Sequence, residues 1–487
     1  MFLRGLLGYL PVNAVQGLAG FAAITIFTRL LSPSEYGYYA LAFALASVLQ
    51  TLCFTWLEAS MFRFQAGEEE QGGSADHIAT IYGLALRVGG LFTVVSGLVI
   101  MLAPLSTELR VGLAVATATV VARTLFKLAG ERRRAMGDVR GFAALELTQT
   151  IGALVLGTAL AVVGAGGAAP LAGLGLAALL GLAWAAPKER KQARGGRFEA
   201  ARIKRYLGYG VPLSLSLIMS LVLTTTDRFL LAHFLDEATV GGYHAGYSLS
   251  SRTLDVFFMA LGMAAVPAAI AAYERGGRGA LNIAARQQAG VMLALGLPAA
   301  VGLALVAQPL SQVMIGAELQ PLAARVTPWI AAGAVFSGFT THYFNQAFIL
   351  SGQTSRLLVA MAFPAVANVL LNLWLIPRHG VDGAMWATTA SFALGAVASC
   401  IVGRGALPLP IPWSTLGGAA AAAGIMAAVV SLAPAWGGLP ELVFKAALGA
   451  FVYGAAAMLL NVAGVRRQGV AMLRRRVAER KPASLPS

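Results

Sequence analysis

The chain has 487 residues, of which 58% are hydrophobic and 12% are charged, and its formal net charge is +15 at pH 7. Soluble globular domains carry a charge on about a quarter of their residues, so this composition excludes that class. The apolar segments are roughly 18–28 residues long and lack the alternating pattern of barrel strands, which leaves an all-α polytopic membrane protein.

Windows of about 19 residues predict fourteen membrane spans. In chain order they lie near 5–30, 37–61, 79–102, 108–129, 141–163, 167–186, 206–232, 243–272, 288–308, 325–350, 356–376, 381–402, 414–434 and 441–463. The first is too long for the apolar core of a signal peptide, so we expect it to remain as a helix. Cys53 and Cys400 lie inside apolar segments, where a cysteine acts as a small hydrophobic residue.

Four basic stretches predict the cytoplasmic side, because short loops rich in Lys and Arg remain in the cytoplasm. The stretches are 127–140, 188–205, 274–286 and 466–481, and all four fall on one side of the predicted spans. An even number of spans then places both termini in the cytoplasm. This bias accounts for most of the positive charge, and no soluble domain offers a basic face, so nucleic acid is not an expected partner.

A repeated pattern divides the chain into two halves. The sequence GYLP at 8–11 opens the first span, and GYGVP at 208–212 opens the seventh. Gly and Tyr recur together at 37–39 and again at 241–243. Each half holds an even number of spans, so both halves enter the membrane from the same side and the repeat is parallel. Two such lobes around a central cavity, with alternating access, are typical of a carrier.

The repeat predicts the domain organisation. Residues 1–187 form an N-lobe with spans 1–6, and residues 188–205 form a basic cytoplasmic linker. Residues 206–404 form a C-lobe with spans 7–12. Spans 13 and 14 lie in 405–465, outside the repeat, and a basic cytoplasmic tail covers 466–487.

Three features resemble a known family: the stretch GYLPVNAVQGLAGFAAITIFTRLLSPSEYGYYALA, the Asp-Arg pair that ends span 7, and the layout of six, six and two spans. They are similar to lipid-linked oligosaccharide flippases of the polysaccharide transporter family, in the multidrug/oligosaccharidyl-lipid/polysaccharide (MOP) exporter superfamily. The resemblance covers nearly the whole chain.

The resemblance implies a transporter, not an enzyme, with no cofactor and no metal site. It implies movement of an undecaprenyl-diphosphate-linked glycan from the cytoplasmic to the periplasmic leaflet of a bacterial inner membrane, for surface polysaccharides such as lipopolysaccharide or exopolysaccharide. The expected partners are this glycolipid, membrane lipid, H⁺ or Na⁺ as a coupling ion, and polysaccharide polymerase machinery.

Charged residues within spans are functional candidates, because each costs roughly 2.5–3.5 kcal/mol on insertion scales. The main candidate is Arg252 in span 8, with Asp255 three residues later. At this spacing the two side chains can pair on one helix face. Either the pair is a structural clamp, or Arg252 binds the substrate diphosphate.

Polar residues in the first helix of each predicted lobe are further cavity candidates. Asn13 and Gln16 share one face of span 1, where they can bond sugar hydroxyls or a neighbouring helix. In span 7, Ser216, Ser220 and Thr224 either line the cavity wall or bond to their own backbone. Both interpretations remain open from the sequence.

Charges near the span ends suggest an entrance and an exit. Arg29, Asp227 and Arg228 lie near the periplasmic ends of spans 1 and 7, as gate or exit candidates or as residues that extend to the interface. Arg123 and Lys127 share a face near the cytoplasmic end of span 4, as entrance candidates or positive-inside anchors.

Glu58 in span 2 and Arg87 in span 3 lie at similar depth in consecutive helices, which predicts a buried structural ion pair. The chain has no GxxxxGK[ST], HExxH or GxSxG pattern, so ATP hydrolysis and the corresponding hydrolase chemistries are not expected.

Two alternatives are weighed against the flippase. A cation-coupled multidrug exporter of the same superfamily would offer an acidic site, yet span 1 has no carboxylate. A membrane polysaccharide polymerase or ligase would present a large periplasmic loop, whereas every predicted outer loop is shorter than about 20 residues.

Overall fold

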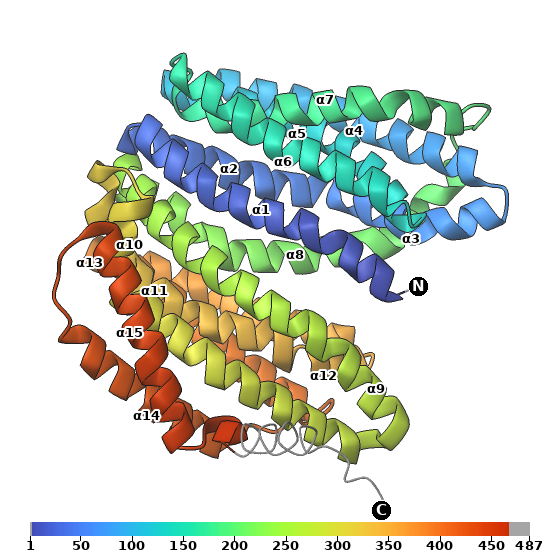
Figure 1. Ribbon diagram of the computed structural model, residues 1–487. Coiled ribbons are helices and arrows are strands. Elements are labelled where there is room, and N and C mark those ends of the chain that lie inside the picture. The colour runs from blue at the N-terminus through green and yellow to red at the C-terminus, as the bar shows by residue number, and fades with distance from the viewer. Residues whose placement is uncertain (1, 467–487) are drawn as a thin grey trace, which may run out of the picture. The chain divides into compact units, whose positions relative to one another are not determined.

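The computed structural model describes residues 2–466, and every regular element within this range is a helix (Figure 1). Twelve helical segments are long and apolar enough to cross a membrane, as judged by length and composition. The predicted all-α polytopic class is therefore confirmed. The tail predicted at 466–487 lies outside the described residues, apart from Arg466.

The first part of the chain forms eight α-helices. They are α1 (Phe2–Leu30), α2 (Pro33–Cys53), α3 (Thr55–Glu70), α4 (Ser74–Leu102), α5 (Thr107–Ala135), α6 (Val139–Val162), α7 (Ala169–Gln192) and α8 (Ala201–Phe234), with a 3-10 turn η1 (Gly166–Ala168) before α7. The predicted span at 37–61 is not one helix. The backbone leaves helical geometry at Phe54, with φ −129°, so the span is divided between α2 and α3.

The rest of the chain contains two very long helices and several shorter elements. They are α9 (Glu237–Leu305), α10 (Ala307–Met314), η2 (Ala317–Leu319), α11 (Gln320–Phe339), the π-helical turn η3 (Thr340–Phe344), α12 (Gln346–Leu350), α13 (Thr354–Arg404), α14 (Trp413–Ser431), α15 (Gly438–Leu459) and η4 (Val462–Gly464).

Glycines break both of the longest helices. In α9 the break falls at Gly276 and Gly277, where φ reaches +60°, and in α13 it falls at Gly380, with φ +56°. Glycine adopts this left-handed region without the steric cost that a Cβ imposes. Each of the two helices therefore holds two of the predicted spans, and the twelve candidate segments accommodate all fourteen.

The start of α2 shows how the local sequence sets a helix boundary. Ser32 Oγ accepts a hydrogen bond from Glu35 N, and Ser32 N donates to Glu35 Oε2 over 2.8 Å. This reciprocal arrangement satisfies donors that have no partner within the helix. Pro33 at the first helical position has the φ that a helix requires.

The described chain divides into two compact units. Unit 1 comprises the chain up to Ser248 together with Met314–Ala323 and Ala365–Thr388, and unit 2 comprises the remainder. Helix α8 packs in unit 1, where Gly210 lies so close to Trp56 of α3 that a Cβ would meet the Trp56 carbonyl oxygen at 2.4 Å. The predicted lobe boundary at 188–205 rests on the sequence repeat and stays a prediction.

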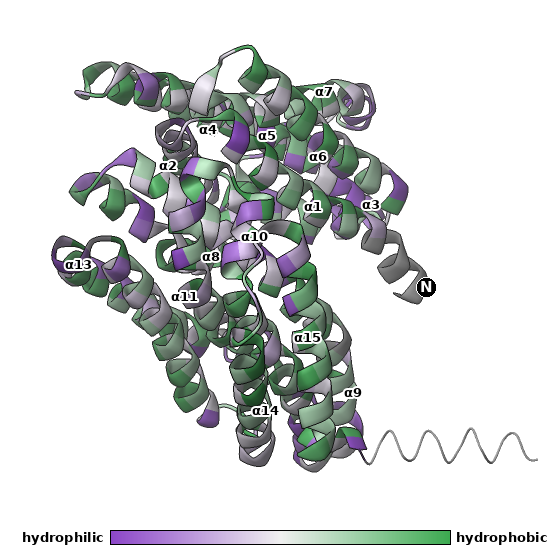
Figure 2. Ribbon diagram, turned by 60° about the vertical axis from the view of Figure 1, so that its left-hand side comes forward, coloured by the Kyte–Doolittle hydropathy of each residue, from purple (hydrophilic) through white to green (hydrophobic). Residues whose placement is uncertain are grey.

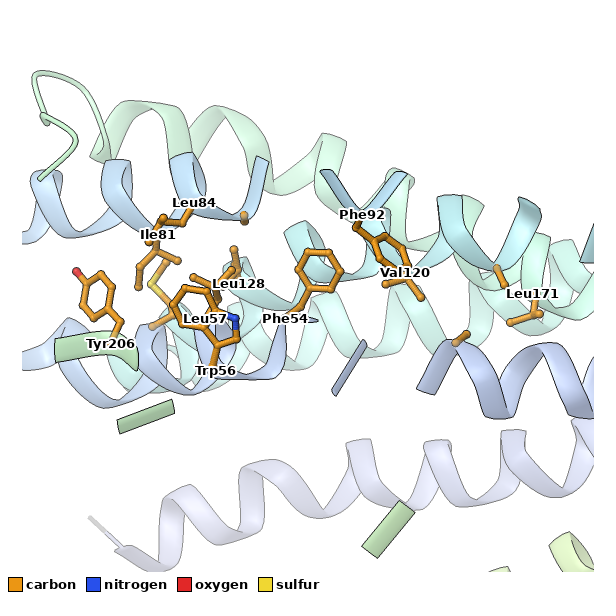
Figure 3. Packing of buried hydrophobic residues seen from close by; sticks show 14 of the residues in the cluster. Phe54, Trp56, Leu57, Ile81, Leu84, Phe92, Val120, Leu128, Leu171 and Tyr206 are labelled. Carbon is orange, nitrogen blue, oxygen red and sulfur yellow. The ribbon is translucent and has the colours of Figure 1, made fainter. Parts of the chain in front are cut away.

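A hydrophobic cluster forms the centre of unit 1 (Figure 3). It joins side chains from α2, α3, α4, α5, α7 and α8 with Phe54 at the break between α2 and α3, and it includes Leu57, Ile81, Leu128, Leu171 and Tyr206. Helices α6 and α7 approach closely through small residues, since a Cβ on Gly173 would lie 2.3 Å from Gly157 N. Such contacts are typical of helix packing in membranes, where no hydrophobic force drives association.

Unit 2 has its own core around Phe258, Met292 and Tyr343. Helices α14 and α15 form an antiparallel pair (Figure 1), packed through alanines such as Ala422 and Ala456. Figure 2 colours long stretches of α9 and α15 as hydrophobic. Exposed apolar side chains of this kind have a natural environment in lipid.

Candidate functional site

A network of polar side chains crosses the interior of unit 1. We call it the α1–α6 polar cluster, and it comprises Gln16, Gln50, Glu58, Arg123, Thr124, Lys127 and Glu146. Gln16 Nε2 donates to Glu146 Oε2 over 2.7 Å and so links α1 to α6. The predicted cavity residue Gln16 is therefore already paired, with a carboxylate that the sequence analysis did not select.

Glu58 is the second carboxylate of the cluster. It accepts a hydrogen bond from Gln50 Nε2 at 2.6 Å and forms an ion pair with Lys127 Nζ at 3.5 Å. Gln50 also donates to Thr124 Oγ1 at 3.1 Å. The break at Phe54 starts a new helix, and from this helix Glu58 reaches α5.

The predicted Glu58–Arg87 ion pair is not formed among the described residues and is corrected to Glu58–Lys127. The Arg87 guanidinium lies over the ring of Phe198, 3.8 Å from its centroid, in a cation–π contact. Depth along consecutive helices suggested the pair, but the rotation of α3 and α4 directs the two side chains to different neighbours.

Arg123 is the least satisfied member of the cluster. Its Nε is buried and has no hydrogen-bond partner among the described residues. Glu58 and Glu146 interact with it electrostatically without forming an ion pair within 4.0 Å. A buried guanidinium with an unused donor can bind an anion or a polar ligand without first breaking an ion pair.

The predicted gate residues Asp227 and Arg228 are buried in unit 1. Asp227 is fully buried and accepts hydrogen bonds from Tyr243 Oη at 2.6 Å and Thr388 Oγ1 at 3.3 Å. Arg228 Nε is 3.1 Å from His244 Nδ1. These contacts tie α8 to α9 and α13, so neither side chain extends to an interface.

The remaining candidates of spans 1 and 7 are exposed or partly exposed, and several bond to the backbone of their own helix. Arg29 is exposed, and its Nη1 donates to Thr25 O on its own helix at 3.2 Å. Asn13 is partly exposed. Ser216 donates to Leu213 O and Thr224 to Ser220 O, which is the local backbone bonding considered as an alternative.

The side chains of Arg252 and Asp255 are both exposed in α9 of unit 2. Within the described residues they form no ion pair with each other or with another side chain, so the clamp interpretation is not supported by a contact. Their mutual influence is electrostatic. Because an unpaired charge is costly in lipid, both side chains require a watery environment at this depth.

The end of the predicted linker at 188–205, which forms the first turns of α8, is fastened to the end of α3. Arg205 Nη1 lies 2.8 Å from Glu68 Oε1, and Arg202 pairs with the other oxygen of the same carboxylate. Burial by itself would favour the neutral acid, but hydrogen bonds from Arg202 and Arg205 hold the pKa of Glu68 below its usual value. The linker is thus held by charged contacts at this point.

A family model described as polysaccharide biosynthesis protein matches residues 26–324, which is more than half of the chain. The chain belongs to this family. The matched region includes every member of the α1–α6 polar cluster except Gln16. No curated protein sequence matches the chain significantly. The family model therefore confirms the family that the sequence resemblance led us to expect.

Solved structures show which fold this family member has. The inward closed conformation of the lipid II flippase MurJ is similar with a TM-score of 0.76 and 14% identity, over 93% of this chain and 98% of that one. An inward-facing multidrug resistance MATE transporter of the MOP superfamily is similar with a TM-score of 0.68 and 14% identity, over 80% of this chain and 94% of that one. An outward-facing MATE transporter of the same superfamily has a TM-score of 0.58 and 15% identity, over 82% of this chain and 94% of that one. The protein thus has the fold of the MOP transporters.

Sequence reasoning missed Gln50, Thr124 and Glu146. Glu146 carried a usable signal, since it is a charged residue within an apolar span and such residues are functional candidates by default. Gln50 and Thr124 carried none, because single amides and hydroxyls are common in membrane helices.

Proposed function

We propose that this family member is a flippase for an undecaprenyl-diphosphate-linked oligosaccharide. It moves the glycolipid from the cytoplasmic to the periplasmic leaflet of a bacterial inner membrane by alternating access, and both of its termini are cytoplasmic. The observation that carries the proposal is the unpaired, exposed Arg252 within a predicted membrane span. The family description and the likeness in fold to a lipid II flippase support the same cargo class.

The chemistry of the cargo explains why such arginines are needed. A diphosphate carries about two negative charges that must cross the hydrocarbon core. A guanidinium binds phosphate oxygens through two parallel N–H donors, which a lysine cannot do. Arg252 in unit 2 and Arg123 in unit 1 each have donors that no described residue uses.

The sugar portion requires hydrogen-bonding groups in place of charge. Asn13 is available on α1 for sugar hydroxyls, and Gln16 is one turn further along the same face. Glycolipid that reaches the periplasmic leaflet would be consumed there by polymerase machinery. Its removal, or a gradient of H⁺ or Na⁺, would make transport directional.

The test compares the polyprenyl-diphosphate lipid pool in cells with and without this gene by mass spectrometry, together with a measurement of leaflet accessibility. We expect a lipid-linked oligosaccharide to accumulate on the cytoplasmic side in the deletion strain. An Arg252→Ala protein should restore transport at least about tenfold less well than wild type, as a charged hydrogen bond is lost. Arg252→Lys should fall between the two.

Arg278→Ala is the matched control, because Arg278 is also an exposed arginine of α9 but lies outside the predicted spans. If Arg252→Ala inserted normally and transported as well as Arg278→Ala, the role of Arg252 would be refuted. An unchanged lipid pool in the deletion strain would refute the flippase itself. Units that reached the periplasm but remained unpolymerised would favour the polymerase or ligase alternative.

A second candidate, a cation-coupled multidrug exporter, is favoured by one specific contact. The carboxylate that span 1 lacks in sequence is provided in space by Glu146, which Gln16 contacts at 2.7 Å. A carboxylate placed there can bind and release a proton or Na⁺ during transport. New drug sensitivity in the deletion strain, restored by wild type but not by Glu146→Gln, would support this function.

A further inference from the structure

A polar cavity of about 970 Å³ lies within unit 2, away from the residues considered so far. We call it the α9–α14 cavity. Its walls come from α9 beyond the glycine break, from the first turn of α14, and from the segment that follows α15. Its polar lining includes Asn282, Arg286, Gln287, Ser414, Thr415 and Asn461.

The walls are in close contact with one another. Ala294 of α9 packs in one hydrophobic cluster with Ala422 of α14 and Ala456 of α15. Tyr453 of α15 also donates a hydrogen bond to Ala294 O of α9 at 2.5 Å. The cavity is therefore bounded by helices packed in van der Waals contact.

The first turn of α14 offers free donors to this cavity. Pro412 is the N-cap residue and has no side-chain cap, and the first helical hydrogen bond runs from Leu416 N to Pro412 O at 3.0 Å. The N–H groups of Ser414 and Thr415 precede that bond, so no carbonyl of the helix accepts from them. The positive end of the helix dipole reinforces their attraction for an anion.

Two side chains, Arg286 and Asn461, add polar groups to the lining. Arg286 is exposed in the lining, and no acidic side chain among the described residues pairs with it. Asn461 adds an amide group to the same lining, and its Oδ1 atom has no hydrogen-bond partner among the described residues.

The predicted topology places the cavity at the level of lipid headgroups. Span 13 begins at the start of α14 and span 14 ends close to the end of α15, both on the predicted cytoplasmic side. Trp413 beside the cavity is 68% exposed, as expected for a tryptophan at a membrane interface. The sequence from 466 to 487 then adds seven Lys or Arg and one Glu, which favours anionic lipid.

We propose that the α9–α14 cavity binds the phosphate of an anionic membrane lipid. Arg286 supplies the charge, the first turn of α14 supplies backbone N–H donors, and the hydroxyls of Ser414 and Thr415 add further hydrogen bonds. The apolar outer faces of α14 and α15 accommodate the acyl chains. This site does not depend on the identity of the transported molecule.

The test uses the purified full-length protein in detergent, with native mass spectrometry to measure binding of dioctanoyl phosphatidylglycerol. Dioctanoyl phosphatidylcholine and inorganic pyrophosphate are the comparison ligands. We expect phosphatidylglycerol to bind preferentially, and Arg286→Gln to weaken its binding at least about tenfold through loss of a charged hydrogen bond. Arg278→Gln removes the same charge from α9 outside the cavity and should leave binding unchanged.

Two results would overturn the proposal. Equal weakening by Arg286→Gln and Arg278→Gln would mean that only general positive charge attracts the lipid. Preferential binding of pyrophosphate, with phosphatidylglycerol unbound or displaced, would reassign the cavity to a soluble phosphate.

A second variant separates binding from folding. Ser414→Asp places a carboxylate at the start of α14, where the helix dipole favours it, so thermal stability without added lipid should stay the same or rise. The same carboxylate should repel the phosphate and reduce phosphatidylglycerol binding about as much as Arg286→Gln. Wild-type binding by a folded Ser414→Asp protein would contradict a phosphate site at this helix end.

Discussion

Replacing Glu189 by Gln should destabilise unit 1 more than the loss of a single surface ion pair would. Glu189 near the end of α7 receives hydrogen bonds from Arg132 Nε at 2.6 Å and Arg132 Nη2 at 3.0 Å. Arg133 Nη1 lies 3.1 Å from the same carboxylate. The three side chains are only 4–6% exposed, so water replaces little of what the carboxylate provides.

The size of the effect follows from this burial. Glutamine preserves the shape of the side chain but leaves two buried guanidinium groups without a counter-charge. Breaking a buried ion pair from one side costs about 3–5 kcal/mol, because the remaining charge stays desolvated. We therefore expect Glu189→Gln to lower the free energy of unfolding by an amount in this range.

Lys188→Gln is the matched control, one residue earlier on α7. Its ion pair with Asp138 spans 3.4 Å, and the two side chains are 56% and 34% exposed, so breaking it should cost less than about 1 kcal/mol. The assay is equilibrium unfolding of the purified proteins in mixed micelles with an increasing fraction of SDS. The reasoning is refuted if Glu189→Gln costs no more than Lys188→Gln.

Two further predictions concern close packing and pH. Gly316→Ala should destabilise the protein or prevent its folding, because a Cβ would lie 1.8 Å from Thr28 O. In the control Gly302→Ala the new Cβ meets no atom within 4 Å, so this change should be neutral. Thermal unfolding in detergent compares the two variants, and equal melting temperatures would count against the packing argument. Hydrogen bonding from Arg202 helps to lower the pKa of Glu68 in the folded protein. The stabilisation that ionised Glu68 provides is therefore complete above the pKa of about 4.3 that Glu has in the unfolded chain, and it is lost as the pH falls through the lower pKa of Glu68 in the folded protein. Unfolding midpoints of wild type and Glu68→Gln between pH 7 and pH 3 should therefore converge on acidification, and a constant difference would contradict this linkage.

The sequence determined the class, the membrane spans and the family of this protein. Hydropathy is a sum over neighbouring residues, so the spans could be located without knowledge of any tertiary contact. The same local rules suggest helix ends, as the Ser32 and Glu35 capping box illustrates. The helix break at Phe54 was missed because no glycine or proline marks it. Phe54 is buried in the core of unit 1, so tertiary packing determines this break.

Only the tertiary structure decided which polar groups meet. Gln16 and Glu146 are 130 residues apart, and Glu58 pairs with Lys127 instead of Arg87. A charge within a span indicates that a partner or a watery environment is needed, but the rotation of each helix selects which one. The α9–α14 cavity likewise exists only because α9, α14 and the end of α15 pack together, which no local pattern in the sequence specifies.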